Sequence, residues 1–163
     1  MIQPNAGQEE AAVPDLYPTG CAGRVIQFSE TEDGRYLITL HGVARFDASS
    51  EVESMRGYRR VIPNWDPYQA DVEGGPGARF DRDHLLAVLR GYFERRGIKA
   101  DWDAIERTDD SELVTTLAML CPFDATEKQA LLVADDPTAR AETMIALMEM
   151  ALHPTDGTDN ARH

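Results

Sequence analysis

An Asp-Gly pair between two runs of alternating apolar residues places the strongest constraint on the first half of this chain. Asp33 and Gly34 follow a strand pattern over residues 24–28 and precede another over residues 35–41. Asp-Gly readily supplies the positive φ angles that a tight turn between antiparallel strands requires. The segment therefore predicts a β-hairpin. Three residues of its second strand are expected on one face: Tyr36, Ile38 and Leu40.

Two further strand patterns follow over residues 43–47 and 58–65, and a short one opens the chain at residues 1–3. Short strands at even spacing favour an antiparallel meander or small barrel over parallel βαβ units. We therefore predict a β subdomain over residues 1–62. Proline and glycine are frequent over residues 63–80, which we predict to be a linker.

Residues 81–153 carry apolar stripes at helical spacing and are predicted to form a helical subdomain. Gly97 is expected to end the first helix and Pro154 the last, and residues 154–163 are expected to be a disordered tail. Aspartates are favoured residues at helix starts, because they accept hydrogen bonds from free backbone amides. The expected capping positions are Asp81, Asp101, Asp109 or Asp110, Asp124 and Asp136. The predicted fold class is α+β.

The charge balance argues against several kinds of partner. Sixteen basic and 29 acidic residues give a net charge of -13, which opposes binding to a phosphate backbone. No apolar run approaches the roughly 20 residues that a membrane span needs. Residues 1–10 lack the basic start and apolar core of a secretory signal. We therefore expect a cytoplasmic protein that binds neither nucleic acid nor membrane.

The sequence lacks the usual residue patterns of ATP hydrolysis and proteolysis. It contains no Gly-x-x-x-x-Gly-Lys-Ser/Thr motif, and neither Lys99 nor Lys128 adjoins a serine-bearing glycine-rich turn. The four histidines include no pair at i, i+4 spacing, and the acidic clusters lie at predicted helix starts, where the helix dipole favours them. We therefore predict no metal, no cofactor and no enzymatic activity.

One catalytic alternative stays open. Cys21 and Cys121 form no Cys-x-x-Cys pair, and their apolar or small neighbours favour buried, inert thiols. Catalytic groups can nevertheless meet in space without being close in sequence. The alternative function is therefore a small hydrolase or thiol enzyme that uses Cys21 or Cys121 with a histidine such as His41.

Met144 and Met148 share one face of the last predicted helix and allow two interpretations. They can fill the core, as an apolar stripe at helical spacing commonly does. Methionine also adapts to varied partners, so an exposed edge of the stripe could hold unfolded polypeptide. Met144 and Met148 are therefore the candidate polypeptide contacts.

The first half contains four further motifs: Pro18-x-Gly20-Cys21-x-Gly23-Arg24, Asp33-Gly34-Arg35-Tyr36, Gly42-x-x-Arg45-Phe46 and Tyr58-Arg59-Arg60. Together they resemble the N-terminal substrate-binding domain of Lon-type ATP-dependent proteases. In the second half, Leu120-Cys121-Pro122-Phe123 and Glu127-Lys128-Gln129-Ala130-Leu131-Leu132 are similar to stand-alone bacterial Lon-domain proteins that lack ATPase and protease segments. The similarity covers about residues 15–152.

The resemblance implies a PUA-like antiparallel β pseudo-barrel followed by a helical bundle. It also implies a non-catalytic domain that binds unfolded or degron-bearing polypeptides in protein quality control or proteolysis. An ATP-dependent protease is a further implied partner.

The chain departs from the family pattern at its start. Family members begin with a Pro- and Leu-rich strand and a helix opened by a Phe-Glu-Pro-Arg-Tyr-like motif, before a strand that resembles Met1-Ile2-Gln3-Pro4. This chain opens at that last strand, so we expect an N-terminally truncated form with an incomplete barrel. Unpaired strand edges and exposed apolar side chains should then favour marginal stability or self-association.

Overall fold

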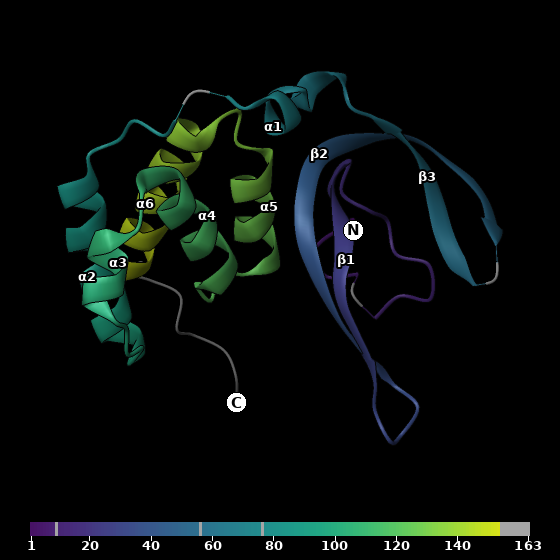
Figure 1. Cartoon of the computed structure of the whole chain (residues 1–163), viewed down its shortest axis with the longest axis horizontal. Helices are drawn as coiled ribbons and strands as arrows, with labels where there is room; N and C mark the ends of the chain where they lie inside the picture. The colour runs from purple at the N-terminus through teal and green to yellow at the C-terminus, as the bar shows by residue number, and fades with distance from the viewer. Residues whose placement is uncertain (9, 56, 76, 154–163) are drawn as a thin grey trace, which may run out of the picture. The chain divides into compact units, whose positions relative to one another are not determined.

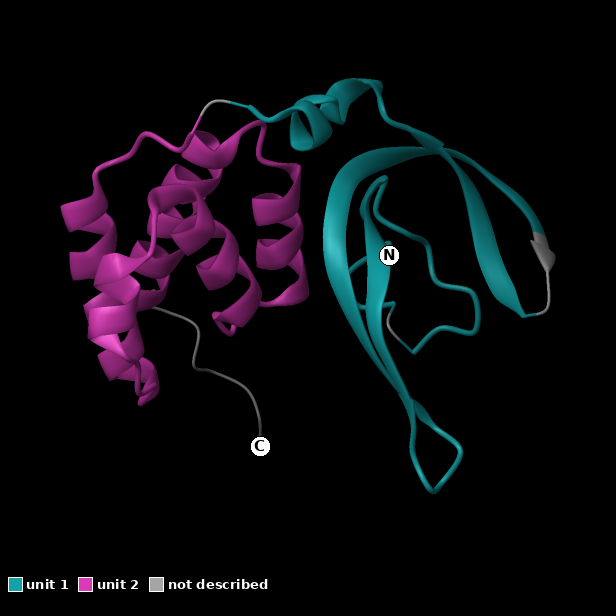
Figure 2. Cartoon of the chain, in the orientation of Figure 1, with its two compact units in different colours: residues 1–75 teal, residues 76–163 magenta. Residues whose placement is uncertain are grey.

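The computed structural model describes residues 1–8, 10–55, 57–75 and 77–153 of the 163-residue chain. The chain divides into two compact units, residues 1–75 and residues 76–163 (Figure 2). The first is built mainly of strands and the second of helices, which confirms the predicted α+β class (Figure 1). The predicted disordered tail over residues 154–163 lies outside the described residues.

Unit 1 contains a three-stranded antiparallel sheet in the order β1-β2-β3. Its strands are β1 (Thr19–Glu30), β2 (Tyr36–Met55) and β3 (Tyr58–Asn64). β1 and β2 form the predicted hairpin, and Gly34 in its turn has φ at +80°. The Thr31 amide donates to the Arg35 carbonyl across this turn at 2.8 Å. The parts of β1 and β2 that lie next to this turn extend as a long arm (Figure 1).

β2 runs as one strand through the predicted break between residues 35–41 and 43–47. The register shifts here, because Gly23 lies opposite Gly42 while Ala22 lies opposite Ala44. Val43 is thus an extra residue in the ladder, and such a β-bulge lets a strand bend and continue without a turn. The predicted division of this segment into two strands is therefore wrong.

The N-terminal segment pairs with the start of β1, as its short strand pattern indicates. The Met1 amino group donates to the Cys21 carbonyl at 2.6 Å, and the Cys21 amide donates to the Met1 carbonyl at 2.9 Å. A side chain on Gly20 would clash with this segment, since its Cβ would lie 2.6 Å from Ile2 Cγ1. Glycine at this position therefore permits the close approach.

The predicted linker over residues 63–80 is wrong for its first part. β3 continues to Asn64, and a 3-10 helix, η1 (Asp66–Tyr68), and a short helix, α1 (Ala70–Glu73), follow it within unit 1. Unit 1 ends at Gly75, so the β subdomain predicted over residues 1–62 extends further. Side chains on β2 hold this added segment, and a local reading of proline and glycine content cannot detect such long-range contacts.

Unit 2 contains five helices among its described residues. They are α2 (Arg82–Arg96), α3 (Trp102–Arg107), α4 (Asp110–Leu120), α5 (Ala125–Val133) and α6 (Pro137–Leu152). Each helix begins after a predicted aspartate cap whose side chain accepts a hydrogen bond from a backbone amide of the first turn: Asp81, Asp101, Asp109, Asp124 and Asp136. Gly97 ends α2 with φ at +65°, as predicted. The predicted stop at Pro154 lies outside the described residues.

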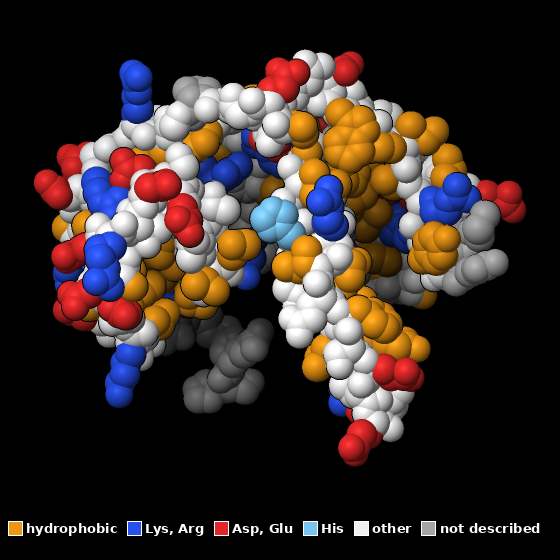
Figure 3. Space-filling model, in the orientation of Figure 1, with side chains coloured by type: hydrophobic (Ala, Val, Ile, Leu, Met, Phe, Trp, Pro, Cys, Tyr) orange, Lys and Arg blue, Asp and Glu red, His pale blue; other side chains and the backbone are white. Residues whose placement is uncertain are grey.

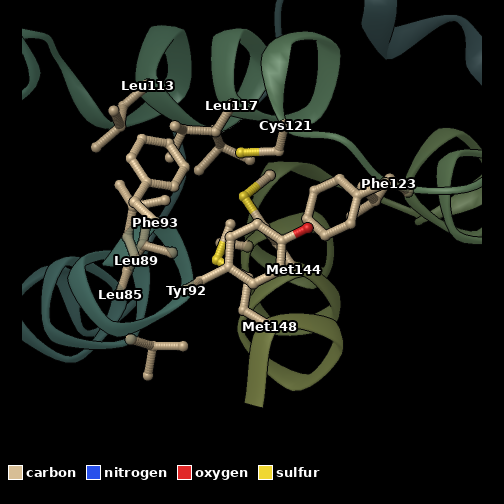
Figure 4. Packing of buried hydrophobic residues seen from close by; sticks show 14 residues of the cluster. Leu85, Leu89, Tyr92, Phe93, Leu113, Leu117, Cys121, Phe123, Met144 and Met148 are labelled. Atoms are coloured by element: carbon tan, nitrogen blue, oxygen red, sulfur yellow. The ribbon is translucent and has the colours of Figure 1, made fainter. Parts of the chain in front are cut away.

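The core of unit 2 combines aromatic rings with sulfur-bearing side chains (Figure 4). Tyr92 on α2 stacks on Phe123 with ring centroids 5.9 Å apart, and Cys121 is buried beside them. Met144 and Met148 are 0% exposed, because α2, α4 and α5 pack against α6. The prediction that these two methionines contact a polypeptide is therefore wrong for the folded unit, and both fill the core.

Candidate functional site

Unit 1 contains an open, largely apolar pocket of about 370 Å³. The N-terminal segment, β2 and β3 contribute its lining residues: Met1, Ile2, Leu16, Phe46, Arg59 and Val61. Hydrophobic side chains gather on this side of the sheet, between β2 and β3 (Figure 3). Concave apolar surfaces with a few polar groups are typical binding sites. The pocket is thus a candidate site for an apolar side chain of a ligand.

Arg59 is the charged group of this pocket, and its position is fixed from two sides. Its guanidinium forms a bidentate pair with Glu51, with two N–O distances of 2.6 Å, and also donates to the Pro14 carbonyl. Hydrogen bonding between the partners raises the pKa of Arg59 and lowers the pKa of Glu51. Arg59 therefore holds the N-terminal segment against β3 and keeps the pocket wall in place.

Phe46 forms the buried wall of the pocket. It is 6% exposed, and its ring lies 5.4 Å from the Trp65 ring, centroid to centroid. Trp65 itself remains exposed, so this aromatic pair connects the pocket wall with the surface after β3. Aromatic rings offer a large contact area to an apolar ligand at little cost in conformational entropy.

The β1–β2 arm, residues 23–41, presents a second apolar surface. Residues directly opposite in an antiparallel pair share a face, as do residues two apart along a strand. Five apolar residues accordingly lie on one face of the arm: Val25, Phe28, Tyr36, Ile38 and Leu40. Their exposed fractions range from 36% at Leu40 to 60% at Phe28, and the Phe28 and Tyr36 rings stack at 5.0 Å.

The other face of the arm is mainly polar. Arg24 lies opposite His41, and Gln27 lies opposite Thr39. Leu37, opposite Ser29, is apolar, and the exposed Ile26 lies at the register shift between Val25 and Gln27. The predicted alternation of Tyr36, Ile38 and Leu40 is therefore confirmed, but their face lies exposed within unit 1 and is not packed into a core. Exposed apolar faces of this kind mark interaction surfaces or aggregation hazards.

The two predicted cysteine candidates differ in environment and lie in different units. Cys121 is 2% exposed, and burial raises the pKa of its thiol to about 11, which opposes formation of a nucleophilic thiolate. Cys21 is half-buried on β1, and its thiol donates to the Ala22 carbonyl at 3.4 Å. His41 lies opposite Arg24, which is three residues from Cys21 along β1, so the Cys21 and His41 side chains point to opposite faces of the sheet. The geometry therefore gives the thiol-enzyme alternative no support.

Within the described ranges, no cluster of three or more potential metal-ligating side chains is found. Nor does any helix in those ranges have the length and apolar character needed to cross a membrane. Sequence reasoning missed the pocket, because the residues that line it lie far apart along the chain. The sequence predicts the alternating apolar residues of the arm. It does not show whether another part of the unit covers them, so their exposure could not be predicted.

Comparisons with known proteins place these observations in a family. The family model described as the ATP-dependent protease La (LON) substrate-binding domain matches residues 2–150. No curated protein matches the chain. The solved structure of a Lon N-terminal domain protein from Xanthomonas campestris is similar, with a TM-score of 0.56 and 22% sequence identity over 83% of this chain and 70% of that chain. At this identity the likeness concerns the fold. Because the family model spans most of its sequence, the chain belongs to the LON substrate-binding domain family.

Proposed function

We propose that this chain is a non-catalytic polypeptide-binding module that serves proteolysis and protein quality control. Its ligands are unfolded or degron-bearing segments, and an ATP-dependent protease is the partner that degrades what it binds. The family description supports a role in substrate binding. The observation that carries the proposal is the apolar pocket of unit 1, which is open and walled by a buried aromatic ring.

An unfolded segment exposes apolar side chains that a folded protein buries in its core. The pocket volume of about 370 Å³ accommodates one or two such side chains. The fixed guanidinium of Arg59 at the wall adds a polar contact for a backbone carbonyl of the ligand. These features are suited to recognising the apolar content of a ligand, with little dependence on the order of its residues. A cytoplasmic location is part of the proposal, since unfolded substrates of this kind arise there.

The experiment measures binding of a permanently unfolded protein to the chain by fluorescence anisotropy. Reduced, carboxymethylated α-lactalbumin carrying a fluorophore is the ligand. Leu16→Asn in the pocket should weaken binding by about five-fold or more, since the contact of one buried aliphatic side chain is lost. Val13→Asn is the matched control, because Val13 lies in the same segment and is already exposed.

Val61→Thr provides a second pocket variant that keeps the side-chain shape and the strand. Circular dichroism melts establish that each variant folds like the parent chain. Equal binding by the parent chain, both pocket variants and the control would show that the pocket does not bind the unfolded protein. Failure of the parent chain to bind the unfolded protein would contradict the proposed function itself.

A further inference from the structure

The exposed apolar face of the β1–β2 arm is built like the covered face of a sheet. Its five apolar side chains form a continuous stripe along two paired strands, and the opposite face of the same strands is mainly polar. Such alternation is typical of a sheet with one covered and one solvated face. The stripe is separate from the pocket, since the two share no lining residue.

The outer edge of β1 is open along the same arm. β1 is an edge strand of the sheet, and the N-terminal segment, where it is described, pairs with the beginning of β1 through Met1 and Cys21. From Gly23 to Glu30, no described residue pairs with this edge. Its backbone amides and carbonyls can therefore accept an added strand, which is a recurrent way to bind an extended peptide.

Bulges limit where a strand can be added. The β1–β2 register is irregular between Ala22 and Gly23 and again between Val25 and Gln27. The stretch from Gln27 to Glu30 is regular, and it carries Phe28 of the apolar stripe. Edge bulges disfavour long ladders between identical sheets. They leave room for a short extended segment.

The charged residues beside the apolar stripe determine which extended segments the arm can bind. Glu30 lies opposite Tyr36 and therefore borders the apolar stripe, and Glu32 follows in the turn. Neither has an ion-pair partner among the described residues. Asp33 differs, because its hydrogen bonds with Arg35 and Thr31 hold its pKa at about 2 and its charge is met by Arg35. The tip of the arm thus keeps two unmatched carboxylates.

We propose that the arm is a second binding site, for an extended polypeptide segment with alternating apolar residues and a flanking Lys or Arg. The segment pairs with the edge of β1, lays its apolar side chains on the stripe and places its basic residue beside Glu30 and Glu32. This inference rests on the proposed function and narrows its ligands to basic, apolar segments. The net charge of -13 acts in the same direction, because it repels acidic segments and second copies of the chain.

The test measures anisotropy of fluorescent peptides of about seven residues, in which Val and Thr alternate between two terminal Lys or two terminal Glu residues. The full chain should bind the Lys peptide about ten-fold more tightly than the Glu peptide, and about 0.5 M NaCl should reduce the difference. Methylating the backbone nitrogens along one edge of the Lys peptide should abolish binding, because the ladder donors are lost. Equal binding of the Lys and Glu peptides overturns the inference.

Matched substitutions on the two faces of the arm test whether the peptide binds to the apolar face. Phe28→Ser should weaken Lys-peptide binding by about ten-fold, whereas Leu37→Ser, on the opposite face and equally exposed, should change it by less than about two-fold. Ile38→Thr gives a second test that keeps a β-branched side chain, should Phe28→Ser unfold the arm. Glu30→Gln combined with Glu32→Gln should remove the preference for Lys over Glu. An unchanged preference, or equal effects of Phe28→Ser and Leu37→Ser, contradicts the inference.

The outcomes also separate this site from the proposed function. Unchanged Lys-peptide binding by Phe28→Ser and Ile38→Thr removes the arm site, and unfolded-protein binding that persists beside it leaves the proposed function intact. Loss of all unfolded-protein binding in the parent chain removes the proposed function. A concentration-dependent dimer in light scattering that Phe28→Ser dissociates would show that a second copy occupies the stripe, which overturns the inference.

Discussion

Arg45 on β2 and Asp71 on α1 form a bidentate ion pair, with N–O distances of 2.8 and 2.9 Å, that ties the end of unit 1 to its sheet. The Arg45 amide also donates to the same carboxylate at 2.9 Å. The guanidinium lies 4.6 Å from the centroid of the Tyr68 ring. Hydrogen bonding to Asp71 raises the pKa of Arg45 despite its burial. These contacts explain why the segment after β3 is ordered although its composition favours a linker.

Arg45→Ala should destabilise unit 1 by about 3 kcal/mol, because it leaves the Asp71 carboxylate partly buried without its cation. Urea unfolding followed by Trp65 fluorescence in a Trp102→Phe background reports on unit 1 alone, since Trp102 lies in unit 2. The matched control is Arg35→Ala, which breaks the exposed Arg35–Asp33 pair and should lower the stability far less than Arg45→Ala does. Equal losses for the two variants would mean that burial does not strengthen the Arg45–Asp71 pair.

Tyr92→Phe should leave the stability of unit 2 unchanged or raise it by about 1 kcal/mol. The Tyr92 hydroxyl is buried and has no hydrogen-bond partner among the described residues, so its removal loses no bond and relieves a desolvation cost. The control is Tyr68→Phe, whose hydroxyl bonds to Asp47 at 3.1 Å and should cost about 1 kcal/mol. Thermal melts of both variants make the comparison. A large loss of stability in Tyr92→Phe would show that the Tyr92 hydroxyl forms a hydrogen bond in solution.

The thiol of Cys121 should react far more slowly with a thiol reagent than that of Cys21. Cys121 is 2% exposed and its pKa is raised to about 11 by burial, so at neutral pH it is almost entirely protonated. Single variants Cys21→Ser and Cys121→Ser allow each rate to be measured alone by absorbance of the released thiolate dye. Fast labelling of Cys121 that urea does not accelerate would contradict the burial, and a rate above that of a free thiol would revive the thiol-enzyme alternative.

Ionisation of Cys121 should also make unit 2 less stable at alkaline pH. The folded state holds the thiol proton up to about pH 11, whereas the exposed thiol loses it near 9.0. Stability is therefore full below pH 9.0 and falls as the pH rises toward 11. Burial raises the pKa of Tyr92 as well, which acts in the same direction at higher pH. Urea midpoints between these pH values should fall less steeply for Cys121→Ala than for the parent chain, and parallel slopes would refute this.

Local chemistry in the sequence accounts for the boundaries of the helices. Asp124 and Glu127 form a reciprocal capping box, and Gly97 takes the left-handed conformation that ends α2. These features depend on residues within one turn of each other, so the sequence alone predicts them. The hairpin turn at Asp33-Gly34 belongs to the same class.

Long-range packing decided the features that sequence reasoning misjudged. Gly42 looks like a strand end, yet it lies at a bulge that only the partner strand reveals. Met144, Met148 and Met150 are close together on one helix, but the first two are 0% exposed and Met150 is 63% exposed. Spacing along α6 cannot tell which of them the other helices cover. The pocket likewise depends on contacts between the N-terminal segment and β3.

Binding of one protein in its unfolded and native forms shows whether the chain holds unfolded polypeptide on apolar surface. The immobilised chain is exposed to native α-lactalbumin and to the reduced, carboxymethylated form at equal concentration, and retention is read by surface plasmon resonance. We expect the immobilised chain to retain the unfolded form and not the native form, and Leu16→Asn should lower the amount retained. Equal retention of both forms, or of neither, would contradict this expectation.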